Sequence, residues 1–268
     1  MVKSSLTRPK NNQALRLRVF AGPNGSGKST IIQAVRDYKI QSIPIDFGIY
    51  INADDIAGQL RDGKFQFSDY EITTSRKEFI DLTTHSGLLG AEFSEKEFKS
   101  SFRFQKDQKL TLTKSEADER IAQIITDFLR KKLLRENRKF SFETVFSHPS
   151  KLDIMRQAKE KGYKVYLYFV STESSEINIY RVQLRKEKGG HDVPVEKIRN
   201  RYTRSLDLVY EASQLAYQSF FFDNSKSQPI LFAHFKMVAG KKKWDRIKEA
   251  EVPEWFRKYY SDKVKKKL

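Results

Sequence analysis

Short apolar runs alternate with amphipathic segments along much of the chain. Strands are expected at residues 15–20, 47–51, 139–146 and 164–170, where aliphatic and aromatic side chains gather. Helical spacing follows the second run, and its clearest apolar stripe is Ile121, Ile124, Ile125, Phe128 and Leu129. Strands that alternate with helices are typical of a parallel sheet with crossover helices. We therefore predict an α/β fold, in which helices cover both faces of a mostly parallel sheet.

The same pattern divides the chain into segments. Residues 1–14 are polar and are expected to be flexible, residues 15–240 form the predicted α/β domain, and residues 241–268 are expected to be a basic tail. Inside the domain, residues 62–114 are polar with helical spacing, which predicts a helical insertion. Residues 178–204 are rich in arginine and contain a glycine pair, which predicts a mobile lid.

The first strand-like run leads directly into a glycine-rich motif. Residues 22–29 read Gly-Pro-Asn-Gly-Ser-Gly-Lys-Ser, a complete G-x-x-x-x-G-K-S/T phosphate loop followed by a helical run. In such a loop, backbone N–H groups surround phosphates, Lys28 adds a positive charge, and the Ser29 hydroxyl binds Mg²⁺. A dinucleotide loop is excluded, because Thr30 stands where its third glycine would be. We expect ATP and Mg²⁺ to bind at Gly22, Pro23, Asn24, Gly25, Ser26, Gly27, Lys28, Ser29 and Thr30.

Three carboxylates follow or lie in predicted strands, near the edge where parallel sheets bind ligands. Asp54 and Asp55 come after the second strand, and Glu143 lies in the strand predicted at 139–146. A kinase needs a carboxylate to accept the proton of the acceptor hydroxyl. Alternatively, Asp54 or Asp55 caps the helix that follows, and one of the two is expected to do so. Glu143 could instead form a salt bridge at the edge of the sheet.

Arginines cluster in the predicted lid. Arg181 and Arg185 are four residues apart on one helix face, and the pair Gly189-Gly190 follows them, then His191. Three more arginines lie on the next helix, at positions 199, 201 and 204. Phosphoryl transfer uses guanidinium groups that close over the leaving phosphates. Arg181 and Arg185 are therefore predicted to bind the nucleotide.

The composition of the chain excludes several classes of protein. The chain has no cysteine, which excludes disulfides and thiol catalysis, and it has no apolar run long enough to span a membrane. Its start lacks the apolar core of a signal peptide, so a cytoplasmic protein is expected. The net charge of +17 is compatible with a highly anionic substrate or with nucleic acid.

Several motifs, taken in order, resemble the zeta toxin family of P-loop kinases, and in particular a branch of short zeta-like predicted ATPases that carry a Gly-Gly-His-x-Val-Pro segment. The resemblance covers roughly residues 15–235 without the insertion. The matching segments are the phosphate loop, Ile-Asn-Ala-Asp-Asp-Ile at 51–56, Phe-Ser-Phe-Glu-Thr-Val-Phe-Ser at 140–147, Ala-Lys-Glu-Lys-Gly-Tyr at 158–163, Arg-Val at 181–182, Gly-Gly-His-Asp-Val-Pro at 189–194 and Phe-Asp-Asn-Ser at 222–225.

The resemblance implies an activity and a partner. Family members use ATP to phosphorylate the 3′-hydroxyl of UDP-N-acetylglucosamine, and a small helical antitoxin blocks their nucleotide site. By this resemblance Asp54 is the catalytic base, Glu143 lies on the sugar-nucleotide side, Arg181 contacts phosphates, and Asn224 lies near the nucleotide base. The family's second lid arginine has no clear counterpart, so Arg185 or His191 takes its place. The insertion is expected to wall the acceptor site.

Two other functions compete with this one. The phosphate loop is similar to those of transporter ATPases, but the chain contains no Leu-Ser-Gly-Gly-Gln-like signature and no apolar run ending in Asp-Glu. An ATPase or kinase that acts on another anionic substrate, including nucleic acid, is the remaining alternative, because of the charge of +17.

Overall fold

The computed structural model of the chain describes residues 14–84, 87–113, 118–190, 192–245 and 249–266. The start that was expected to be flexible therefore lies almost wholly outside the described residues, and so does His191. Within the described part, no helix combines the length and the apolar content that crossing a bilayer requires.

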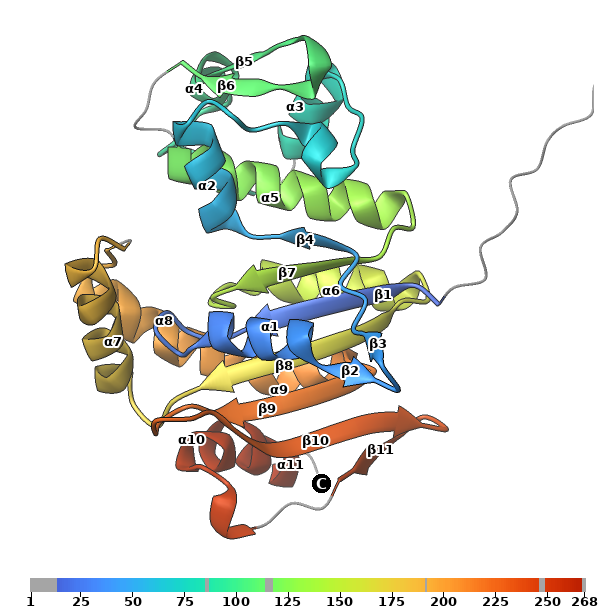
Figure 1. Cartoon of the computed structure of the whole chain (residues 1–268), viewed down its shortest axis with the longest axis vertical. Helices are drawn as coiled ribbons and strands as arrows, with labels where there is room; N and C mark the ends of the chain where they lie inside the picture. Colours follow the sequence, from blue (N-terminus) through green and yellow to red (C-terminus); the bar gives the residue numbers. More distant parts are fainter. Residues whose placement is uncertain (1–13, 85–86, 114–117, 191, 246–248, 267–268) are drawn as a thin grey trace, which may run out of the picture.

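A seven-stranded sheet forms the centre of the molecule (Figure 1). The five strands from β4 to β9 pair in parallel, and β10 and β11 extend the sheet in antiparallel fashion. The predicted α/β fold with a mostly parallel sheet is thus confirmed. In spatial order the strands are β11 (Lys241–Trp244), β10 (Ile230–Val238), β9 (Gln218–Asp223), β8 (Lys164–Ser171), β1 (Arg16–Ala21), β7 (Phe140–Thr144) and β4 (Ile49–Ile51).

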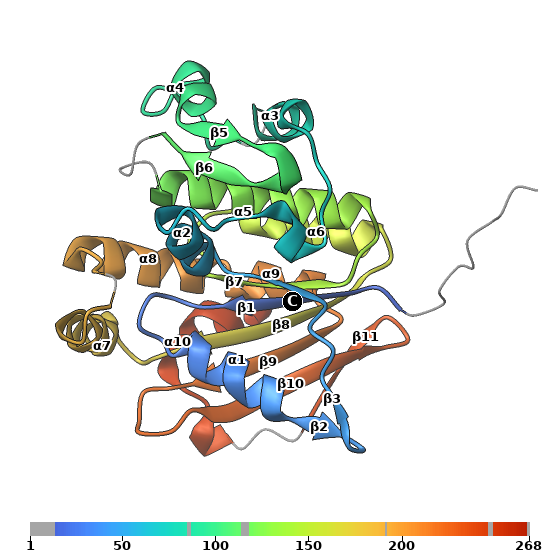
Figure 2. The same cartoon turned by 45° about the horizontal axis from the view of Figure 1, so that its top comes forward.

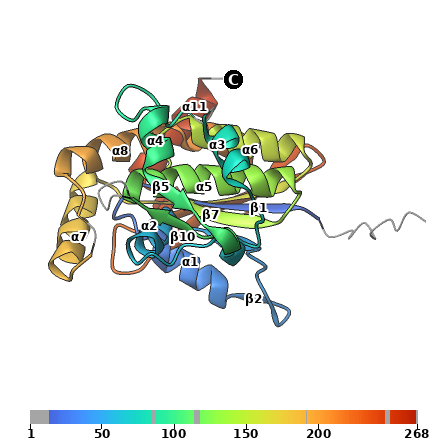
Figure 3. The ribbon, with the colours of Figure 1, turned by 90° about the horizontal axis from the view of Figure 1, so that it is seen from above.

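The two faces of the sheet are covered unequally (Figure 3). One face carries α1 (Lys28–Asp37) and a small hairpin of β2 (Lys39–Ile40) and β3 (Ile43–Pro44). The other face carries α6 (Ser150–Glu160), α9 (Val209–Leu215) and the C-terminal helices (Figure 1). The central strands are buried on both faces, which explains why they read as almost continuous apolar runs.

Two helices at the β4 edge carry the segment 62–114. They are α2 (Ala53–Arg61) and α5 (Asp118–Arg135), and the segment stands above them in Figures 1 and 2. It was expected to be helical, but it also contains a hairpin of two strands, whose short Phe-x-Phe and Leu-x-Leu alternation is weak evidence in a polar segment. Its elements are η1 (Phe67–Tyr70), α3 (Arg76–Thr84), α4 (Glu95–Ser100), β5 (Phe102–Phe104), η2 (Lys106–Gln108) and β6 (Leu110–Leu112).

Buried phenylalanines join this segment to the rest of the domain. Phe79 contacts Phe67, Phe98 and Phe102 within the segment, and it also contacts Phe128 of α5. Because all five rings are almost completely buried, the segment shares a continuous core with α5.

The pair formed by α7 (Ser175–Glu187) and α8 (Val195–Asp207) stands at the carboxyl edge of the parallel strands (Figures 1 and 3). It has a small core of its own, made by Ile179, Val182, Val193 and Ile198. The pair contains the arginine-rich segment 178–204. Its predicted movement as a lid stays a prediction.

The residues expected to form a basic tail are built into the domain instead. Lys241–Trp244 is strand β11, and the following elements are η4 (Glu249–Glu251), α10 (Glu254–Phe256), η5 (Arg257–Ser261) and α11 (Asp262–Lys265). Trp255 is 3% exposed, and its ring packs against Phe169 and Phe232 of the sheet. The lysine runs flank a few large aromatic residues, and these residues do the packing against the sheet.

We expect Trp255→Ala to lower the free energy of unfolding by about 3–5 kcal/mol, because it removes a buried ring from the core. Trp255→Phe is the matched control, since it keeps a ring but loses the Nε1–H that donates to Asp223 Oδ1 at 3.1 Å. Urea denaturation measures both. If the alanine variant unfolded like the wild type, these residues would be a dispensable tail after all.

Candidate functional site

The phosphate loop lies between β1 and α1, at the carboxyl end of the sheet. Gly27 has a φ of 92°, and a Cβ atom there would lie 2.1 Å from Asn224 Nδ2, so this position requires glycine. No side chain caps the N-terminus of α1. The first turn of the helix can therefore offer N–H groups and the positive end of its dipole to an anion.

Lys28 is buried at the centre of this loop. Its Nζ donates hydrogen bonds to the carbonyl oxygens of Gly22 at 3.0 Å and Pro23 at 3.1 Å, and lies 3.7 Å from Glu143 Oε1. Burial lowers the pKa of the Lys28 ammonium; the carboxylates of Glu143 and Asp54 oppose this shift, and Arg185 adds to it. Glu143, Asp54 and Arg185 thus all lie close enough to Lys28 to influence its ammonium group.

Glu143 approaches the loop from the neighbouring strand β7. Its Oε2 accepts hydrogen bonds from Tyr50 OH at 3.3 Å and from Asn52 Nδ2 at 3.4 Å. Just beyond it, Phe146 is fully buried with a φ of 59°, a left-handed conformation that is rare for a bulky residue. The ion pair of Glu143 is the 3.7 Å contact of its Oε1 with Lys28 Nζ. Glu143 therefore pairs with the phosphate-loop lysine and not with an unrelated residue at the edge of the sheet.

Asn52 connects the two acidic segments of the site. Its Oδ1 accepts the backbone N–H of Asp54 at 2.9 Å and so caps α2, while its Nδ2 donates to Glu143. The expectation that Asp54 or Asp55 caps this helix was wrong: the cap lies two residues before Asp54, because Asn52 has the extended backbone that a capping residue needs.

The two aspartates at the start of α2 face different neighbours. The negative charge of Asp54 opposes the lowering of the pKa of both Lys28 and Arg201. Asp55 lies near Arg36 of α1 instead; burial and the charge of Asp54 raise the pKa of the Asp55 carboxyl, and Arg36 opposes this shift. Asp54 is therefore the aspartate on the phosphate-loop side, as the sequence prediction requires.

Arg181 holds the turn after β9. Its guanidinium donates to the carbonyl oxygens of Asn224 at 2.7 Å and Lys226 at 3.2 Å. Asn224 in turn donates from Nδ2 to the Ser26 carbonyl oxygen at 2.8 Å. Arg181 was predicted to contact phosphates, but in this structure it binds the turn that steadies the phosphate loop.

Two other arginines approach the loop itself. Arg201 of α8 donates to Asn24 Oδ1 at 3.3 Å, and Arg185 lies near Lys28. Burial lowers the pKa of the Arg201 guanidinium, and the carboxylates of Glu119 and Asp54 oppose this shift. Arg199, by contrast, pairs with Glu176 and Glu196. Arg201 was not among the predicted site residues, because its position depends on how α8 packs over the loop.

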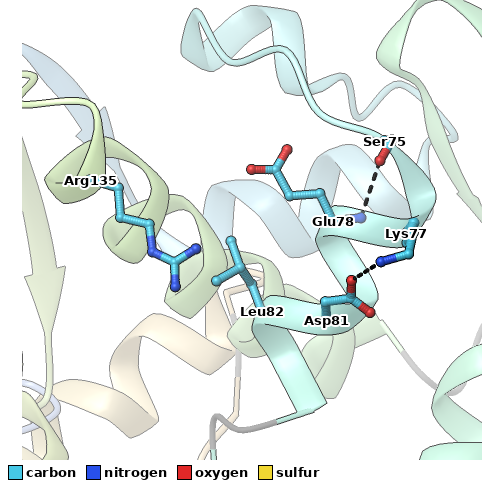
Figure 4. A pocket seen from close by; sticks show the side chains of 6 residues that line it. All are labelled: Ser75, Lys77, Glu78, Asp81, Leu82 and Arg135. Carbon is cyan, nitrogen blue, oxygen red and sulfur yellow. Dashed lines mark hydrogen bonds and ion pairs between the residues drawn. The ribbon is translucent and has the colours of Figure 1, made fainter.

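Two open hollows lie elsewhere, on the segment 62–114. The one in Figure 4 has a volume of about 360 Å³ and lies between α3 and α5, where Lys77 pairs with Asp81 and Glu78 with Lys132. The other, of about 550 Å³, is lined by residues of α4. Lys99 pairs with Glu95 in this second hollow, and neither hollow includes a residue of the phosphate loop. The loop remains the candidate site.

The sequence of the chain matches a protein-family model and a curated relative. Residues 93–224 match the family model described as Zeta toxin, a range that begins after the phosphate loop and includes Glu143, the α7–α8 pair and Asn224. A Haemophilus influenzae protein described as uncharacterized is 33% identical over 63 residues, which are 24% of this chain and 45% of that protein.

Solved structures share the fold. A chain from the crystal structure of AvrRxo1-ORF1 and AvrRxo1-ORF2 with sulphate ions has a TM-score of 0.53 and 14% identity, and the form with ATP has a TM-score of 0.51 at the same identity. Each comparison covers 89% of this chain and 62% of the other. The present chain thus spans less than two thirds of the length of these relatives, and at this identity the likeness shows the fold.

We expect Asn52→Ala to lower the free energy of unfolding by about 1 kcal/mol, because the N-cap of α2 is lost. Asn52→Ser should stay within about 0.5 kcal/mol of the wild type, since serine caps helices about as well as asparagine and adds no charge beside Glu143. Chemical denaturation compares the two variants. Equal losses in both would show that the amide contact with Glu143, and not the cap, is the stabilising interaction.

Proposed function

We propose that this chain, whose residues 93–224 match the family model described as Zeta toxin, is an ATP-dependent kinase that phosphorylates a sugar hydroxyl of a nucleotide sugar. UDP-N-acetylglucosamine is the first acceptor to test, as the family implies. The observation that carries the proposal is the position of Lys28: it lies in a complete phosphate loop, beside the carboxylates of Glu143 and Asp54. A phosphate-binding cation and a candidate base therefore share one site.

The loop side of the site suits a triphosphate. Backbone N–H groups at the start of α1, Lys28 and the arginines Arg185 and Arg201 supply the positive charge. Ser26 Oγ is buried without a hydrogen-bond partner among the described residues, as expected of a group that awaits a ligand. One structural neighbour is described with ATP, which fits this reading.

Ser29, exposed at the second position of α1, is the residue that would hold Mg²⁺. The ion would neutralise charge on the phosphate oxygens when bound. The protein contributes the rest of the positive field through Lys28 and the arginines. Removing one of these cations should therefore slow phosphoryl transfer strongly while it changes the free energy of unfolding little.

The carboxylate side suits an acceptor hydroxyl. Asp54 accepts the hydroxyl proton while the acceptor oxygen forms its bond to the γ-phosphorus and the bond from that phosphorus to the β,γ-bridging oxygen breaks, which releases ADP. Glu143 is held by Tyr50 and Asn52 and orients the acceptor. Asn52 fixes the spacing of the two carboxylates, because it binds both segments.

A protein partner follows from the same family match. The neighbouring structures are described as complexes of AvrRxo1-ORF1 with AvrRxo1-ORF2. A small helical antitoxin that covers the nucleotide site is the partner we propose for this chain.

The proposal is tested by incubating the protein with ATP, Mg²⁺ and a panel of nucleotide sugars and nucleosides, and by searching for a phosphorylated product by mass. We expect Asp54→Asn to lower the rate by orders of magnitude while ATP binding persists, because the base is lost and the loop is intact. The matched control is Asp55→Asn, one residue away, which should keep most activity. Equal activity in Asp54→Asn and the wild type would remove Asp54 from the chemistry.

The two arginines should respond differently to replacement. We expect Arg201→Ala to lower kcat at least 100-fold with little change in the KM for ATP, as loss of a transition-state contact does. Arg181→Ala should mainly raise the KM for ATP, because the turn that steadies the phosphate loop is loosened. Steady-state kinetics separates the two effects. If Arg181→Ala lowered kcat and Arg201→Ala raised the KM for ATP, Arg181 would be the residue that contacts the phosphates.

A further inference from the structure

A row of cations crosses one face of the sheet at the end away from the phosphate loop. It is formed by Lys139, Arg16, Lys164, Lys236 and Lys243, which we call the cation row. In the sheet register Arg16 lies beside Lys164, and Lys236 lies beside Lys243. In the spatial order from β7 to β11, every strand except β9 contributes one member. In the parallel strands β7, β1 and β8, this member lies at the start of the strand or just before it.

The members lie on the same face as α1, and their contacts show it. Arg16 and Lys139 both pair with Asp46, at 3.9 and 2.8 Å. Lys164 and Lys236 lie over the same Tyr217 ring, with Nζ atoms 4.9 and 5.9 Å from its centre. The β10–β11 extension of this face has no helix in front of it in Figure 1, and Lys164, Lys236 and Lys243 are exposed.

The row is long and has one gap, at β9. Neighbouring strands of a sheet lie about 4.8 Å apart, so the five steps from β7 to β11 carry the row over about 24 Å. In β9, where the row has no cation, Gln218 pairs with Lys236 in the register, and Tyr217 contacts Tyr166. A buried arginine, Arg18, lies beneath the row and over the Tyr166 ring.

Carboxylates on this face do not cancel the charge. Asp46 is shared between Arg16 and Lys139, and Asp245 is hydrogen-bonded to His234. Among the ion pairs of the described residues, Lys164, Lys236 and Lys243 have no acidic partner. Lys164 of β8 and the uncovered β10–β11 extension therefore carry exposed positive charge in a line, beside the Tyr217 ring.

We propose that the cation row binds the phosphate backbone of single-stranded nucleic acid. A line of charge matches a chain of phosphates, each of which one cation can neutralise. Tyrosine rings beside the row provide the aromatic contacts that accompany such grooves. An acidic protein partner is less favoured, because the charges are arranged along a line and do not surround an apolar anchor.

This surface is separate from the proposed active site. The row members of the parallel strands stand where those strands begin, whereas the phosphate loop stands where they end. Nucleic acid bound to the row would leave the phosphate loop free. The inference thus goes beyond the proposed kinase activity, and either one can fail without the other.

The test measures binding of a fluorescein-labelled 20-nucleotide oligo(dT) to the full chain by anisotropy, from 50 to 200 mM salt and without ATP. Five phosphate contacts predict a slope of log K against log salt of about −3.5, which is roughly a 100-fold loss over this range. The variant Lys164→Gln/Lys236→Gln/Lys243→Gln should reduce the slope to about −1.4 and the loss to about 7-fold.

A matched variant controls for net charge. Lys96→Gln/Lys106→Gln/Lys265→Gln removes the same charge from exposed positions outside the row and should bind like the wild type. Thermal unfolding checks that both variants fold. Equal slopes for the two triple variants would overturn the proposal, and so would equally effective displacement of the oligonucleotide by polyglutamate, which would indicate an acidic protein partner.

Discussion

A buried lysine ammonium that needs anionic partners is the constraint on which the site depends. Lys28 lies where the phosphate loop turns into α1, and two loop carbonyls and Glu143 partly neutralise it. Burying a cation is costly unless charges compensate it. The loop is therefore held in a state that phosphates can improve, because they replace weak carbonyl contacts with full negative charges.

The parallel topology brings the other groups to this lysine. Residues 28, 54 and 143 are far apart in the sequence, but β1, β7 and β4 are neighbours in the sheet and end at the same edge. Asn52 then fixes the distance between two of these segments by binding Asp54 through its backbone and Glu143 through its side chain. From the other side, α8 contributes Arg201, and the turn after β9 contributes Asn224.

Local signals in the sequence were enough for the fold and for the centre of the site. The phosphate loop carries its own motif, and the doubly buried strands read as apolar runs, so the parallel sheet could be predicted. The cap at Asn52 was missed because several residues in Asn-Ala-Asp-Asp are good caps, and only the backbone conformation decides between them. Arg201 and the contacts of Arg181 depend on how α7 and α8 pack, which one sequence does not encode locally. The burial of Trp255 against the sheet could not be predicted either, because its partners Phe169 and Phe232 lie on strands distant in the sequence.

The central claim is that Glu143 contacts the acceptor and not ATP, and that the phosphates of bound ATP replace its ion pair with Lys28. Calorimetric titration of Glu143→Gln with a non-hydrolysable ATP analogue tests it most directly. If the claim is right, the variant binds the analogue as tightly as the wild type or a few-fold more tightly, because a competing charge has been removed. Binding that is ten-fold weaker or worse would contradict the claim, since Glu143 would then be part of the nucleotide site itself.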